Sequence, residues 1–113
     1  MERKYPVKIE RVIDADTLVL NVDVGYRMTF TDAFRLARIN APEMRTQEGK
    51  DAKTWLTNFL HESEKAGKTF HIICTKHGKY RWVAEIYVKG GIFDNQNIND
   101  LIVKAGHAIY KEY

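Results

Sequence analysis

A stretch of helical periodicity near the middle of the chain separates stretches that alternate as β-strands do, and this change of period constrains the fold most. Five apolar side chains recur at helical spacing between residues 52 and 60: Ala52, Trp55, Leu56, Phe59 and Leu60. Gly67 follows where a C-cap glycine belongs. We therefore predict one amphipathic helix here, flanked on both sides by strands.

Short apolar runs on either side of this helix predict five strands. Three precede the helix, at residues 7–12, 17–24 and 34–39. Two follow it, at residues 70–75 and 82–88, where apolar and polar side chains alternate with a period of two. Alternation of this kind is typical of strands with one buried face, as in a sandwich or barrel.

A second, short helix fits residues 99–105, with Asn97 or Asn99 as its N-cap and Gly106 just past its end. The resulting order, βββ-α-ββ-α, predicts a mainly β fold with helices (α+β), laid out as a five-stranded OB-fold barrel. A chain of 113 residues suits one domain with one core, so we expect residues 1–113 to form a single domain.

Composition and charge limit the partners. Eighteen Lys and Arg against fifteen Asp and Glu give a net charge of +3, which permits a polyanionic partner without requiring one. No apolar run approaches the ~20 residues of a membrane-spanning helix, and no signal peptide is visible, so we expect no membrane association. We expect a monomer that is cytoplasmic by default, with secretion after processing left open.

The segment Asp14-Ala15-Asp16-Thr17 lies at the bend between the first two predicted strands. One interpretation is a turn in which the short carboxylates accept hydrogen bonds from nearby backbone N–H groups. The other is half of an oxygen-ligand site for a hard cation such as calcium, which prefers carboxylates and carbonyls. The segment alone does not decide between them.

The segment from Arg35 to Glu43 carries a charged residue where the pattern is apolar. Arg35 shares a predicted strand face with Ala37 and Ile39, so its guanidinium needs an anionic partner. Pro42 fixes its own φ and helps to aim Glu43. The partner of Arg35 is either a glutamate in a structural ion pair or a bound phosphate.

A basic cluster, Lys79-Tyr80-Arg81, precedes the fifth predicted strand. It is either a solvated turn or part of a phosphate site, in which Arg81 joins Arg35 as a second planar fork. In that second interpretation Tyr80 stacks on a base and Lys79 contacts a neighbouring phosphate.

Together these segments resemble the staphylococcal nuclease family, the thermonuclease-like branch of OB-fold phosphodiesterases. The matching stretches are residues 12–18, 35–43, 79–86 and 98–108, in the family's order. The resemblance implies a five-stranded barrel with flanking helices and calcium-dependent cleavage of DNA and RNA.

The resemblance also implies a role for each matching residue. Three positions correspond to the family's calcium ligands, the last through its backbone carbonyl: Asp16, Asn40 and Ala41. Three correspond to the catalytic set, two arginines on the phosphate and a glutamate that is the usual general base: Arg35, Arg81 and Glu43. Two resemble the pair that contacts the nucleotide, Lys79 and Tyr80, while Asp14 and Thr17 would support the metal site.

Three positions depart from the family pattern. Asn40 replaces an aspartate, which keeps an oxygen ligand but removes one negative charge and should weaken calcium binding. Ala15 replaces a glycine, which puts any left-handed backbone there at risk. No glycine separates Tyr80 from Arg81.

We therefore expect a calcium-dependent phosphodiesterase, non-specific for the sugar, that hydrolyses DNA and RNA to 3′-phosphate products. Nucleic acid is its expected partner and Ca2+ its expected cofactor. The alternative is a catalytically weak or silent OB-fold module that only binds nucleic acid, and Asn40 and Ala15 are the residues that favour it.

Overall fold

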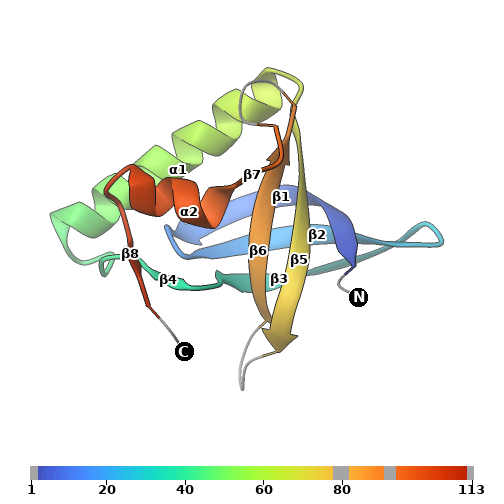
Figure 1. The fold of residues 1–113 in the computed structure, drawn as a ribbon, viewed down its shortest axis with the longest axis horizontal. Helices are drawn as coiled ribbons and strands as arrows, with labels where there is room; N and C mark the ends of the chain where they lie inside the picture. Colours follow the sequence, from blue (N-terminus) through green and yellow to red (C-terminus); the bar gives the residue numbers. More distant parts are fainter. Residues whose placement is uncertain (1–2, 78–81, 91–93, 112–113) are drawn as a thin grey trace.

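The computed structural model describes residues 3–77, 82–90 and 94–111. Its five long strands form one barrel, and they are β1 (Lys4–Asp14), β2 (Thr17–Gly25), β3 (Met28–Leu36), β5 (Thr69–His77) and β6 (Trp82–Lys89). They pair antiparallel in the order β3-β2-β1-β5-β6. A parallel pairing of β3 with β6 closes the barrel, as Figure 1 shows. The predicted five-stranded OB-fold barrel is confirmed.

Two helices and three two-residue strands complete the described chain: β4 (Ile39–Asn40), α1 (Gln47–Lys65), β7 (Gln96–Asn97), α2 (Ile98–Lys104) and β8 (Ile109–Tyr110). The predicted order, with one helix after the third strand and one after the fifth, is confirmed. Helix α2 begins after Asn97, whose side chain accepts the N–H of Asp100 at 3.1 Å. Asn97, rather than Asn99, is therefore the N-cap.

The core fills the barrel and the face that the two helices cover. Strand residues with almost no exposed surface include Leu18, Leu20, Leu36, Ile72 and Ile86. Helix α1 contributes Ala52, Leu56 and Leu60, and α2 contributes Ile98 and Ile102. Burial of each such large side chain contributes about 1.5–3 kcal/mol to folding, so the predicted apolar face of α1 holds the helix to the barrel.

The third strand differs from its prediction over residues 34–39. Strand β3 starts at Met28 and ends at Leu36, and the chain pairs again only at β4. The break comes at Arg38, whose φ of 67° leaves the extended region. The sequence did not predict the start of β3 at Met28, because residues 28–32 are all exposed and show no alternation of buried and exposed side chains. They form a hairpin with β2 that reaches beyond the barrel (Figure 1).

Within the described residues, no helix has the length and apolar character to cross a membrane.

Candidate active site

The bend between β1 and β2 places Asp16 at the edge of the barrel interior. Asp14 Oδ1 accepts the N–H of Asp16 at 3.2 Å, as the turn interpretation predicts. Ala15 is buried, and its φ is not among the positive values of the described chain. Alanine therefore fits the position without left-handed strain, and this departure from the family pattern is harmless to the backbone.

Arg35, near the end of β3, has the anionic partner that its apolar surroundings require. Its Nη2 lies 3.2 Å from Asp16 Oδ2 and 3.2 Å from Asn40 Oδ1. Its Nη1 donates to the carbonyl oxygens of Asp16, at 3.3 Å, and Leu36, at 3.1 Å. The side chains of Arg35 and Asp16 are only 9% and 11% exposed. The anionic partner described here is thus a buried aspartate from the β1–β2 bend, where the sequence had suggested a glutamate or a bound phosphate.

The carboxylate of Asp16 gathers further donors. Its Oδ2 accepts the backbone N–H of Ala41 at 2.9 Å, and its Oδ1 accepts the Thr17 hydroxyl at 3.2 Å. The first of these hydrogen bonds joins Asp16 to Ala41, which lies 25 positions later in the sequence. The structure brings together four of the predicted site residues: Asp16, Arg35, Asn40 and Ala41.

The two aspartates of the bend have opposite ionisation behaviour. Burial and the neighbouring Asp16 carboxylate raise the pKa of Asp14 to about 6. Burial also acts to raise the pKa of Asp16, but hydrogen bonds from Asp14 and Ala41 and the charge of Arg35 outweigh it, so that pKa is lowered. Asp16 is therefore the stable anion of the pair, and Asp14 carries the proton in mildly acid solution.

Glu43 lies in the connection between β4 and α1, with its backbone held firmly. Its carbonyl oxygen accepts the Thr46 N–H at 3.0 Å and the Thr46 hydroxyl at 2.7 Å. The first turn of α1 passes so close that an ideal Cβ on Gly49 would lie 2.0 Å from this oxygen. The side chain is 67% exposed, and its Oε2 pairs with Nε of Arg45 at 2.5 Å. The carboxylate faces solvent from a fixed backbone position.

The predicted basic cluster Lys79, Tyr80 and Arg81 lies outside the described residues. The described chain resumes at Trp82, which is half-buried against the core and meets Phe30 edge to face, with ring centroids 6.0 Å apart. This packing agrees with a core role for Trp82.

Asn99 is a buried polar residue whose role the sequence did not reveal. Its Oδ1 accepts the N–H of Ile86 at 3.1 Å, and its Nδ2 donates to the carbonyls of Ala37, at 2.9 Å, and Ala84, at 3.2 Å. It thereby ties α2 to β6 and to the break after β3. The sequence signal that could have indicated this role is a polar asparagine that lies between two apolar positions of the helix, Ile98 and Ile102.

Arg38 forms a second ionic cluster next to the site. Its Nε and Nη2 donate to Oε1 of Glu85, and its Nη1 lies 3.0 Å from Oδ1 of Asp100. The Tyr110 hydroxyl donates to the same Asp100 oxygen at 2.9 Å, and Tyr110 pairs with Ile39 across β4 and β8. These contacts fix the strand that presents Asn40.

The oxygen atoms around Arg35 are of the type that hard cations prefer, but the Arg35 guanidinium holds them in this structure. The side-chain oxygens of Asp16 and Asn40 converge on one guanidinium nitrogen, so both already face a single positively charged point. Calcium prefers such carboxylate, amide and carbonyl oxygens. These candidate metal ligands carry little negative charge, since Asp16 is a carboxylate and Asn40 is neutral. Among the described residues, no group of three or more His, Cys, Asp or Glu side chains is placed to hold a metal ion.

Comparison with known proteins identifies the family of the chain. A family model described as staphylococcal nuclease homologue matches residues 33–113. The chain belongs to the staphylococcal nuclease homologue family. The match covers Arg35, Asn40, Ala41 and Glu43, whereas Asp16 precedes it and joins the site through the barrel. No curated protein matches the chain significantly. Family membership supports a function of the nuclease or nucleic-acid-binding type.

Proposed function

We propose that this protein is a calcium-dependent, sugar-non-specific phosphodiesterase that hydrolyses DNA and RNA to 3′-phosphate products. The observation that carries the proposal is the convergence of Asp16 and Asn40 on Nη2 of Arg35. A buried carboxylate, an amide oxygen and a guanidinium at one edge of the barrel are the groups needed to hold a cation beside a phosphate.

Asp16, Asn40 and the carbonyl of Ala41 would hold the calcium ion. When bound, calcium supplies positive charge that polarises a phosphoryl oxygen. Asp16 suits this task because its pKa is lowered despite burial, so its carboxylate stays ionised. Asn40 contributes oxygen without charge, and calcium affinity is therefore weak in this proposal.

Arg35 would bind the phosphate and stabilise the negative charge that grows in the transition state. A planar guanidinium matches phosphate oxygens in bidentate geometry, and such donors act most strongly where water is excluded. The three hydrogen bonds and the ion pair of Arg35 described above go to Asp16, Leu36 and Asn40. Phosphate binding thus requires the guanidinium to exchange some of these partners. Arg81 is the proposed second phosphate fork, and Lys79 and Tyr80 the proposed nucleotide contacts.

Glu43 would accept the proton of the attacking water. A general base must reach its water in a productive pose, and the fixed backbone beside Gly49 with an outward carboxylate provides this access. The ion pair with Arg45 must open when substrate binds. Pro42 limits the backbone conformations from which Glu43 projects.

A second candidate function is a silent nucleic-acid-binding module. It is favoured by the same contacts, because Arg35 already neutralises Asp16 and satisfies Asn40 without a metal ion. Such a module would bind single strands with strong salt dependence and release no product.

Cleavage of plasmid and single-stranded DNA, with calcium or with chelator, tests the proposal. We expect cleavage only with calcium, and a loss of about 100-fold or more in Glu43→Gln and Arg35→Lys. Glu48→Gln, which removes an exposed carboxylate from the first turn of α1, serves as the matched control and should keep full activity. Cleavage that persists in chelator or in Glu43→Gln would refute the mechanism, and binding without cleavage would establish the silent module.

A further inference from the structure

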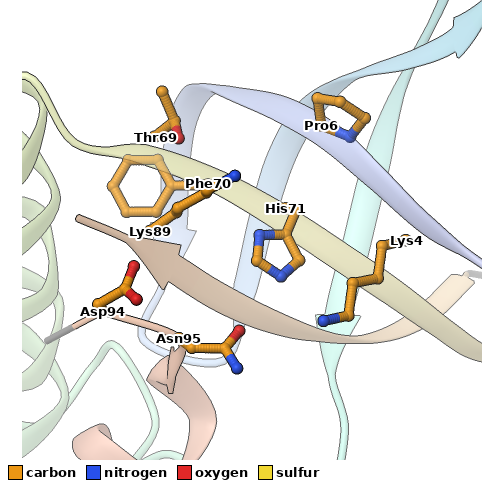
Figure 2. Close-up of a pocket in the computed structure, with 8 residues that line it drawn as sticks. All are labelled: Lys4, Pro6, Thr69, Phe70, His71, Lys89, Asp94 and Asn95. Carbon is orange, nitrogen blue, oxygen red and sulfur yellow. The ribbon is translucent and has the colours of Figure 1, made fainter.

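A pocket at the far end of the barrel from Asp16 gathers basic side chains that the proposed active site does not use. It has a volume of about 530 Å3 and is lined by Lys4, Pro6, Thr69, Phe70, His71, Lys89, Asp94 and Asn95 (Figure 2). Val83 of β6 pairs with Arg35 across the β3–β6 ladder, and Lys89 lies six residues further along β6. Six residues of extended strand span about 20 Å, so the pocket is remote from Arg35. The volume is within the ~300–1,000 Å3 typical of ligand pockets.

His71 lies at the centre of this pocket, with Lys4 on one side and Lys89 and Asp94 on the other (Figure 2). Its ring stacks on Tyr87, with centroids 5.4 Å apart and planes at 12°. Its Nε2 is covered and has no hydrogen-bond partner among the described residues. An unpaired buried polar atom is unfavourable, so a ligand that turns the ring and pairs with this nitrogen relieves that cost.

The surrounding charges favour an anion as that ligand. Two ammonium groups, Lys4 and Lys89, face the imidazole, and one carboxylate, Asp94, opposes them. The carboxylate of Asp94 makes a local hydrogen bond, in which its Oδ1 accepts the N–H of Gly90 at 2.8 Å. Lys4 lies over the Tyr87 ring at 5.9 Å, and such an exposed cation–π contact is weak. Its ammonium group can therefore turn toward a ligand at small cost.

The pocket wall is preformed on the side opposite Lys4. Asn95 donates its backbone N–H to the carbonyl of Val88 at 2.7 Å and has a φ of 61°, a conformation that asparagine tolerates better than most residues. Its side chain faces the pocket beside His71 (Figure 2). Thr69 and Asn95 thus add neutral polar groups to the basic ones.

We propose that this pocket binds a phosphate group, held between Lys4 and Lys89 and paired with His71. Phosphate oxygens accept hydrogen bonds from ammonium groups and from an imidazole N–H. The negative charge of a phosphate also balances the positive charges of the two lysines. The group could belong to a free phosphate monoester or to the phosphodiester backbone of a nucleic acid. The pocket is separate from the proposed active site and does not depend on cleavage.

Nuclear magnetic resonance of the His71 ring tests the proposal in the intact protein. Inorganic phosphate and, separately, an oligothymidylate are titrated in the presence of chelator, at constant ionic strength set with sodium chloride. We expect a saturable shift of the His71 resonances and an increase in its pKa. The two titrations are compared at equal concentrations of phosphate groups. If oligothymidylate saturates the site at the lower concentration, the ligand is a backbone phosphodiester. If inorganic phosphate does so, the ligand is a free phosphate.

The double variant Lys4→Gln, Lys89→Gln provides the decisive comparison. Both side chains are exposed, so the fold should survive. We expect at least about tenfold weaker phosphate binding at His71, while the pKa of His71 in the absence of phosphate rises, because two positive charges are gone. Lys65→Gln, Lys104→Gln makes the same change in net charge elsewhere and should bind as the wild type does. Absence of a saturable His71 shift with both probes, or undiminished binding in the first variant, would overturn the proposal.

Discussion

Nη2 of Arg35 lies 3.2 Å from Oδ2 of Asp16, and the two side chains are among the most buried charged groups of the described chain. The contact joins the β1–β2 bend to the end of β3, 19 residues apart in the sequence. Because two charges removed from water stabilise a fold only when each has its partner, this pair makes the structure of the site and the stability of the barrel interdependent.

Asp16→Asn should therefore destabilise the protein strongly. The substitution leaves the Arg35 guanidinium buried without its carboxylate, and loss of one partner of a buried pair costs about 3–5 kcal/mol. Urea unfolding followed by circular dichroism measures the change. Asp51→Asn removes a carboxylate from the exposed face of α1 and should stay within about 0.5 kcal/mol of the wild type. Equal effects of the two substitutions would show that the Arg35–Asp16 pair carries no special stability.

Stability should fall in mild acid through His71. Burial, followed by the charges of Lys4 and Lys89, lowers the pKa of His71 below its usual 6.5. The unfolded chain then binds a proton at a pH where the folded chain does not, so the free energy of unfolding declines as pH falls below about 6.5. His71→Gln removes this titration. The stability of the wild type relative to His71→Gln should decrease from pH 7.5 to pH 5.5, measured in the same urea series, and a pH-independent difference would contradict the assignment.

The barrel was predictable because its determinants are local. The period-two alternation of β5 and β6 and the helical spacing of Ala52, Leu56 and Leu60 are set by which side chains must be buried. The limits of β3 were not predictable by this route. Its first five residues are exposed, and its end depends on Arg38, whose left-handed backbone is held by Glu85 and Asp100 from distant elements.

The site was predictable in part, from the resemblance rather than from the spacing of its residues. The need of Arg35 for an anion followed from its apolar neighbours, but the identity of that anion did not, because Asp16 reaches it only through the register of β2 with β3. Asn99 escaped prediction for the same reason: its three backbone partners, in Ala37, Ala84 and Ile86, become neighbours only after the barrel closes. The roles of Lys79, Tyr80 and Arg81 stay predictions.

Gly49→Ala should disturb the loop that carries Glu43. In a helix alanine is favoured over glycine by about 1 kcal/mol, but here its Cβ would lie 2.0 Å from the Glu43 carbonyl oxygen and 2.9 Å from that of Pro42. Backbone atoms must shift to remove this overlap, which typically costs about 1–3 kcal/mol. We expect lower stability and, if Glu43 is the general base, a lower kcat for DNA cleavage.

The neighbouring substitution Lys50→Ala provides the control for that experiment. Lys50 is exposed in the same helical turn, so alanine there should leave stability within about 0.5 kcal/mol of the wild type. If Gly49→Ala is as stable as Lys50→Ala, the close approach of α1 to Glu43 does not fix the loop.

Asn40→Asp should strengthen calcium binding. The Oδ1 atom of Asn40 and the carboxylate of Asp16 face the same nitrogen of Arg35, so an aspartate adds a negative charge at the point where calcium would bind. We expect the calcium concentration at half-maximal cleavage to fall about tenfold, because ligand charge is a main determinant of calcium affinity. Calorimetric titration with calcium, without substrate, should show the same change and separates binding from turnover. Asn58→Asp, on the exposed part of α1, adds the same charge and should change neither value. An unchanged calcium requirement in Asn40→Asp would show that residue 40 is not a ligand.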